Sequence, residues 1–177
     1  MRTRKTLIAA AACAFTLVPA TFASAGTGPA PASDQQRADG RKSTVPSAAG
    51  NPASTKARAA QVCADAYQIG ETAYIDSGTT RVASVKQFYS PKCEENYGYV
   101  WVWDSFRDQT NMDWDVTVGV YSFDQDKYLG QRTWRNTRGQ EFWSSPADTV
   151  KECTTAVGFV RHTSHPLPAQ ATTDSSC

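Results

Sequence analysis

The stretch Trp114-Asp115-Val116-Thr117-Val118-Gly119-Val120-Tyr121 determines the fold class. Its large apolar side chains occupy every second position, and small or polar residues stand between most of them. Successive side chains of a strand point to opposite faces of a sheet, so strict alternation predicts a half-buried β-strand. A second stretch, Tyr97 to Asp104, alternates aromatic residues with glycine and valine. Both of its faces are apolar, which predicts a central strand that is covered on two sides.

Five further stretches are candidate strands, and residues typical of turns separate them. They are Gln68 to Ile75, Val82 to Tyr89, Tyr128 to Trp134, Gly139 to Trp143 and Thr154 to Arg161. Short strands at this spacing predict an all-β or mostly β fold, a small antiparallel sandwich or barrel stapled by disulfides. A helix from Pro146 to Ala156 is the alternative for one segment, because Ser145 can cap it and proline suits its first turn.

The start of the chain has the pattern of a secretory signal. Three basic residues lie among the first five, an apolar run extends from Leu7 to Ala20, and the small residues Ala23-Ser24-Ala25 follow. This pattern predicts a signal peptide over residues 1–25, cleaved after Ala25, and hence an extracellular protein. The apolar run is shorter than the roughly 20 residues that span a bilayer, so we expect no stable membrane anchor. Loss of the three basic residues changes the formal net charge from +1 to −2.

The composition divides the remaining chain into three parts. Residues 26–60 contain Val45 as their one large aliphatic residue and have no aromatic residue. Such a segment buries too little apolar surface to offset its ordering entropy, which predicts a disordered Ala/Pro/Ser-rich linker. A β domain is expected over residues 61–163 and a polar tail over residues 164–177. The β domain has no cluster of lysine and arginine, so nucleic acid is not an expected partner.

Four cysteines remain once Cys13 leaves with the signal peptide: Cys63, Cys93, Cys153 and Cys177. An even number in an exported chain predicts two disulfides, and three pairings are open. None of the four shows the Cys-x-x-Cys or Cys/His spacing of a zinc site. We therefore expect no metal site and no other cofactor.

One part of the β domain resembles a known family. The residues are Cys63-Ala64-Asp65-Ala66, the stretch Val85 to Cys93 that ends in Tyr-Ser-Pro-Lys-Cys, and then Tyr97 and Val100. This pattern resembles secreted actinomycete domains grouped as domain of unknown function 2690, over about Cys63 to Val102. Two residues depart from the family pattern, which usually has an aliphatic residue at the position of Gln87 and tryptophan at that of Tyr97.

The resemblance implies a secreted β domain in which Cys63 pairs with Cys93, and it supplies no catalytic residue. The order of the elements agrees, since Cys63 precedes the first candidate strand and Cys93 follows the second. If these strands form a hairpin, both cysteines lie at one end of it, within reach of a disulfide. Cys153 would then pair with Cys177 and hold the tail against the domain.

The residues of the β domain give weak indications of catalysis. It has no Gly-x-Ser-x-Gly motif, and the two histidines of the chain, His162 and His165, lie at and just beyond its end. Carboxylates are more numerous, and a pair of them serves as the acid and base of many glycosidases. They are Asp104, Asp108, Asp113, Asp115, Asp124, Asp126 and Glu141. Aspartates between strands more commonly shape turns, so the pattern favours a non-catalytic protein and leaves an enzyme as the alternative.

Aromatic residues are the richest feature of the β domain, with all five tryptophans and all seven tyrosines between Tyr67 and Trp143. They either fill a small core or form an exposed face that stacks on sugar rings or docks a protein. The candidate binding residues are Tyr99, Trp101, Trp103, Trp134 and Trp143. The function expected is thus a secreted, non-catalytic domain that binds a cell-wall or other polysaccharide or an extracellular protein. The alternatives are a small carboxylate-dependent hydrolase and a structural component of the cell surface or spore coat.

Overall fold

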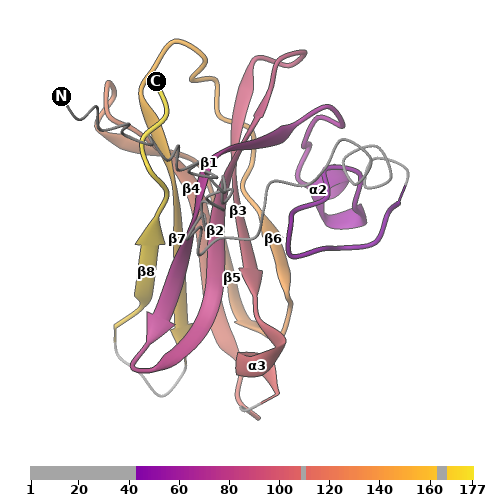
Figure 1. The fold of residues 1–177 in the computed structure, drawn as a ribbon, viewed down its shortest axis with the longest axis vertical. Helices are drawn as coiled ribbons and strands as arrows, with labels where there is room; N and C mark the ends of the chain where they lie inside the picture. Colours follow the sequence, from indigo (N-terminus) through magenta and orange to yellow (C-terminus); the bar gives the residue numbers. More distant parts are fainter. Residues whose placement is uncertain (1–42, 109–110, 163–166) are drawn as a thin grey trace, which may run out of the picture.

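The computed structural model describes residues 43–108, 111–162 and 167–177. Two antiparallel four-stranded sheets pack face to face, with the strand orders β1-β2-β3-β6 and β5-β4-β7-β8 (Figure 1). The predicted β fold is confirmed, and the sheets form a sandwich rather than a closed barrel. The predicted signal peptide, residues 1–25, lies outside the described residues. Among the described residues, no helix is long and apolar enough to cross a membrane.

The first sheet begins with a long hairpin. The sheet consists of β1 (Tyr67–Ser77), β2 (Thr80–Ser90), β3 (Glu95–Val102) and β6 (Glu141–Trp143), and the hairpin is formed by β1 and β2. The turn between β1 and β2 contains Gly78 at a φ of +60°, a conformation that glycine adopts without strain. A short helix, α3 (Asp104–Arg107), follows β3.

The second sheet is built on the stretch that determined the fold class. It consists of β4 (Trp114–Ser122), β5 (Lys127–Thr137), β7 (Thr154–His162) and β8 (Ala169–Thr172). The seven candidate strands are thus all confirmed as strands, with ends that differ by a few residues. The helix considered for Pro146 to Ala156 does not form. There the backbone of Ala147 exchanges two hydrogen bonds with Asn96, of 2.9 and 3.0 Å, and β7 begins at Thr154.

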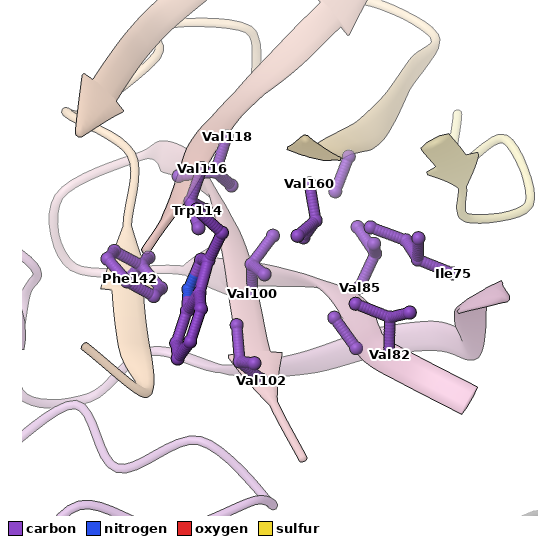
Figure 2. Packing of buried hydrophobic residues seen from close by; sticks show 12 residues of the cluster. Ile75, Val82, Val85, Val100, Val102, Trp114, Val116, Val118, Phe142 and Val160 are labelled. Atoms are coloured by element: carbon purple, nitrogen blue, oxygen red, sulfur yellow. The ribbon is translucent and has the colours of Figure 1, made fainter. Parts of the chain in front are cut away.

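The core lies between the two sheets, where the aliphatic side chains of both interdigitate (Figure 2). Val85 and Val100 from the first sheet face Val116 and Val118 from the second, and all four are 0 % exposed. Gly158 on β7 permits this close approach, because a Cβ there would lie 2.6 Å from a methyl group of Val85. The alternation of β4 therefore places its valines as the sequence predicted.

A buried polar network also joins the sheets. Gln87, one of the two departures from the pattern of the family that the sequence resembles, is 0 % exposed. Its amide donates to Thr154 Oγ1 at 2.7 Å and Asn96 Oδ1 at 3.3 Å. Because a buried amide without partners is costly, these bonds explain how a polar side chain is tolerated at this position.

The predicted linker needs correction, because residues 43–60 are folded against the sandwich. We call residues 43–66 the N-terminal segment; it includes helix α2 (Thr55–Ala59), whose N-cap Ser54 accepts a hydrogen bond of 3.0 Å from Ala57. Ala57 and Ala60 are 0 % and 3 % exposed. The segment packs against the outer face of the first sheet, on Phe88, Tyr97, Tyr99, Trp101 and Trp143. The large rings of the sheet supply the apolar surface that the segment lacks, and its alanines fit closely over them.

Residues 167–177 of the predicted polar tail are held against the domain, and they include a strand that the sequence did not predict. Strand β8 pairs with β7, and Thr154 forms an isolated bridge with Ser176. Thr155 Oγ1 adds a hydrogen bond of 2.6 Å to the carbonyl of Thr173. Strand pairing satisfies backbone groups whatever the side chains, so a polar sequence can still form an edge strand.

Both predicted disulfides are confirmed. Cys63 is bonded to Cys93 and Cys153 to Cys177, with sequence separations of 30 and 24 residues. The first bridge joins the two ends of the β1–β2 hairpin, as the order of the elements indicated. The second holds the end of the described chain beside the start of β7.

Candidate functional site

Three of the five candidate binding residues are buried. Tyr99 is 0 % exposed, Trp143 1 % and Trp101 8 %, because the N-terminal segment covers their face of the sheet. The Tyr99 ring centroid lies 4.4 Å from that of Trp143, and its hydroxyl donates to Ser47 O at 2.6 Å. Burial raises the pKa of Tyr99 well above 10. The core interpretation holds for these three rings, and they offer no binding surface.

The other two candidates, Trp103 and Trp134, are half-buried and pack against different hydrophobic clusters. Trp103 packs against the same cluster beneath the N-terminal segment. Trp134 on β5 packs on Phe142, with 5.0 Å between ring centroids. The Arg132 guanidinium lies 4.9 Å from the centroid of the Trp134 ring. The predicted set is therefore not brought together as one surface.

A different group of four aromatic residues lies on the outer face of the second sheet, two of them exposed and two half-buried. We call it the ring cluster: Tyr121, Phe123, Tyr128 and Phe159. Tyr121 lies 5.2 Å from Tyr128 and 5.3 Å from Phe123, and Tyr128 lies 6.3 Å from Phe159, measured between ring centroids. Phe123 is 51 % exposed and Tyr128 48 %.

The alternation of β4 explains the position of the ring cluster. Val118 and Val120 point into the core, so Tyr121 points outward, and Tyr128 is its direct partner on β5. Gly119 has no side chain on this face. Phe159 on β7 is the partner of Thr117, which lies two positions before Gly119 on β4. The Tyr128 ring can therefore reach Phe159 diagonally across β4, over Gly119.

Groups that form hydrogen bonds surround the ring cluster. Thr117 and Thr133 share a hydrogen bond of 2.9 Å beside Phe159, and Gln170 on β8 is the register partner of Phe159. The Tyr121 hydroxyl donates to the Asp126 carboxylate, and this bond raises the pKa of Tyr121. The face thus combines apolar rings with exposed hydroxyl and amide groups.

The rings are inclined to one another. The interplanar angles are 87° between Tyr121 and Phe123, 60° between Tyr121 and Tyr128, and 68° between Tyr128 and Phe159. They do not form one flat platform. Each ring can instead make a separate stacking contact with a ligand that turns along its length.

The carboxylates considered for hydrolysis are mostly held by structural partners. Asp115 accepts from the Asn136 N–H at 2.9 Å and pairs with Arg161, and these two groups lower its pKa despite its partial burial. Asp104, Asp113, Asp124, Asp126 and Glu141 each accept from a side chain or backbone donor of the described chain. Among the described residues, the one pair of carboxylates in which the charge of one shifts the pKa of the other lies elsewhere: burial and then Asp148 raise the pKa of Glu95.

The motif behind the family resemblance has a structural role. Cys63, Asp65 and Cys93 lie close enough together to suggest a metal site, but both sulfurs belong to the disulfide. Burial acts to raise the pKa of Asp65, but hydrogen bonds from the Ser90 hydroxyl at 2.9 Å and the Lys92 N–H at 3.1 Å outweigh it and lower the pKa. These bonds fix the ends of the hairpin.

Fold and surface together define a disulfide-stapled β-sandwich with an exposed aromatic face. No protein-family model matches the chain, and no curated protein or solved structure matches it. The resemblance described above therefore stays a prediction.

Sequence reasoning missed the ring cluster, although part of its signal is local. The stretch from Tyr121 to Tyr128 places three aromatic residues around a charged turn, where the core cannot take all of them. Phe159 carried no such signal, because only strand pairing brings it to Tyr128.

Proposed function

We propose that this chain is an extracellular, non-catalytic domain that binds single polysaccharide chains through the ring cluster. The observation that carries the proposal is the exposure of Phe123 and Tyr128, 51 % and 48 %, within a contiguous group of four rings. Contiguous exposed apolar groups on a small protein commonly mark an interaction surface. The predicted signal peptide supports export, and two disulfides are compatible with an oxidising compartment.

The fold does not require the ring cluster for its own packing. Neither of the two buried hydrophobic clusters contains any of the four rings. Other large rings fill those clusters, among them Trp114 and Trp143, which are 2 % and 1 % exposed. Surface rings without a core role favour an external ligand.

The surroundings of the rings favour a sugar polymer as that ligand. A sugar ring presents an apolar face of C–H groups and a rim of hydroxyls, so it requires both stacking surface and hydrogen-bonding groups. Thr117, Thr133 and Gln170 supply uncharged hydroxyl and amide groups beside Phe159. The inclined rings suit a single, twisted chain better than a flat crystalline surface, and cell-wall polysaccharide is the source that export favours.

Retention on polysaccharide tests the proposal. The protein is passed over insoluble peptidoglycan, chitin and cellulose and run through gels that contain soluble glycans. Tyr128→Ala should weaken retention by about three- to tenfold, since one ring contact contributes roughly 0.5–1.5 kcal/mol. The thermal midpoint should change little, because Tyr128 is half exposed.

Tyr67→Ala is the matched control. Tyr67 is 43 % exposed on β1 and stacks edge-on against Tyr89, but it belongs to the other sheet. The Tyr67→Ala variant should be retained on the glycan as strongly as the unmodified protein. Equal losses in both variants, or no retention of the unmodified protein on any glycan, would contradict the proposal. Release of reducing sugar from a bound glycan would favour the hydrolase alternative, and capture of a protein through Tyr128 would favour a protein ligand.

A further inference from the structure

Two positive side chains line a cavity at the edge of the sandwich. The cavity has a volume of about 280 Å³ and lies between the N-terminal segment and the strands β5 and β6, which are terminal strands of their sheets. We call it the edge cavity. Its positive residues are Lys56 on α2 and Arg132 on β5. Pro46, Lys56 and Ala59 are exposed, so a ligand can enter on the side of the N-terminal segment.

The two positive groups have no ion-pair partner among the described residues. Each of the four ion pairs in that part of the chain joins an arginine to an aspartate, and neither Lys56 nor Arg132 takes part. Neither side chain donates a hydrogen bond within the described chain. Residues 43–177 contain more acidic than basic side chains, so a surplus of bases does not explain two unpaired cations in one cavity. An anion from outside the chain would provide the missing partner.

Arg132 is held in an orientation that suits a carboxylate. The side chain is half-buried, and its guanidinium lies 4.9 Å from the centroid of the Trp134 ring, which is fixed in turn by packing on Phe142. Stacking uses one face of the guanidinium and leaves the N–H groups at its edge free to donate. Two N–H groups of an arginine match the two oxygens of a carboxylate, and this paired contact is stronger than a neutral hydrogen bond. Lys56 is a second and more flexible donor for the same group.

The Glu141 carboxylate also belongs to the lining, but a ligand cannot touch it. Its Oε1 atom accepts hydrogen bonds from the Ser54 hydroxyl at 2.6 Å and Trp143 Nε1 at 2.8 Å, and its Oε2 atom is buried. The single negative charge of Glu141 offsets only part of the positive charge of Lys56 and Arg132. A cationic ligand would therefore meet two like charges at the accessible wall, whereas a carboxylate would meet two donors.

We propose that the edge cavity binds a carboxylate that is carried on a single ring, as in a uronic acid or an aromatic acid. Arg132 and Lys56 hold the carboxylate, and Pro46, Ala59 and Trp134 offer apolar surface to the ring. The volume is slightly below the roughly 300–1,000 Å³ of pockets for drug-sized ligands, which suits one ring. This site uses none of the four residues of the ring cluster and does not depend on the function proposed for them.

Titration with acids and their neutral counterparts tests the class of ligand. The protein is titrated at low ionic strength with D-galacturonate beside D-galactose, and with benzoate beside benzamide, and ligand-detected NMR and tryptophan fluorescence are recorded. At least one acid should bind, and its neutral counterpart should bind about tenfold more weakly or not at all, because hydrogen bonds between charged groups are lost. Binding of galacturonate alone would identify a sugar acid as the ligand, and binding of benzoate alone an aromatic acid.

Matched pairs of variants test the location of the site. Lys56→Gln and Arg132→Gln should each weaken binding of the acid about tenfold. Arg58→Gln on α2 and Arg135→Gln on β5 are the controls, since both residues are exposed, carry the same charge and do not line the cavity. These two variants should bind as the unmodified protein does. Lys56 is exposed, so its variant should stay folded even if Arg132→Gln lowers the thermal midpoint.

A third variant blocks the cavity without a change of charge. Ala59→Phe places a ring into the cavity from an exposed position on α2 and should abolish binding while the domain stays folded. Tyr128→Ala should leave binding of the acid intact, which separates this site from the ring cluster.

Four outcomes would overturn the proposal. If neither acid binds, the class of ligand is wrong. If an acid and its neutral counterpart bind equally well, the carboxylate is not the group that is recognised. If the control variants lose as much affinity as Lys56→Gln, the acid responds to the general charge of the surface. If Ala59→Phe binds as the unmodified protein does, the acid binds outside the edge cavity.

Discussion

Replacing Lys86 with methionine should stabilise the protein at neutral pH, and the gain should disappear in alkaline solution. Lys86 lies on β2 with 5 % of its surface exposed, and its ammonium group donates one hydrogen bond of 3.0 Å to Gln68. Burial lowers the pKa of this amine from 10.5 to about 8. The cause is desolvation, which disfavours the charged form.

The sign and size of the effect follow from proton linkage. Below pH 8 both the folded and the unfolded chain carry the proton on Lys86, and the folded state bears the full cost of burying the charge. A shift from 10.5 to about 8 corresponds to about 3 kcal/mol, at 1.36 kcal/mol per pH unit. Between pH 8 and 10.5 the folded state releases the proton first, so this cost falls to zero as the pH rises.

Methionine removes the charge but also the bond to Gln68, which contributes about 1 kcal/mol. The free energy of unfolding of Lys86→Met, relative to the unmodified protein, should therefore be about 2 kcal/mol higher at pH 7 and about 1 kcal/mol lower at pH 10.5. Urea unfolding of both proteins at four pH values measures this difference. The ionisation of tyrosines affects both proteins equally and therefore cancels in the difference. Lys151→Met, at an exposed position, is the control and should show no trend. A difference that is constant from pH 7 to 10.5 would refute the argument from desolvation.

Three further substitutions test the packing of the sandwich. Ser54→Ala removes the N-cap of α2 and a donor to the buried Glu141, so urea unfolding should show a loss of about 1–3 kcal/mol; an unchanged midpoint would contradict the docking of the N-terminal segment. Gln87→Leu should cost about 1–3 kcal/mol in the same assay, because it leaves buried polar partners without a donor, whereas a gain in stability would mean that the network is dispensable. The double variant Cys153→Ala/Cys177→Ala should lose about 3–4 kcal/mol and speed amide exchange in β8 more than in β1, and uniform exchange would argue against a local role for this bridge.

The strands were predictable because their signal is local. Alternation along β4 separates inward valines from outward residues without any knowledge of the partner strand, and the turns between strands have their own residue preferences. The central position of β3 was also predictable, since aromatic and aliphatic residues on both faces require cover on both sides. The sequence did not show what provides that cover.

The errors share a physical cause. Residues 43–60 contain few large apolar residues, so their composition indicates disorder, yet the rings of the first sheet hold them. Strand β8 is short and polar and gives no strand signal of its own, yet it pairs with β7. The same limit applies to the candidate site. The segment that covers Tyr99 and Trp143 has the composition of a linker, and Phe159 joins the ring cluster only through strand register.

The strand order of the first sheet affects how the chain can fold as it is synthesised. Its fourth strand, β6, comes after β4 and β5 of the other sheet, and Ser54 contacts Glu141 across 87 residues of sequence. The β1–β2 hairpin can form early, but its sheet stays incomplete until most of the second sheet exists. Non-local pairing of this kind slows folding and leaves unpaired strand edges and apolar surface exposed for longer. We therefore expect the two sheets to fold together rather than one after the other.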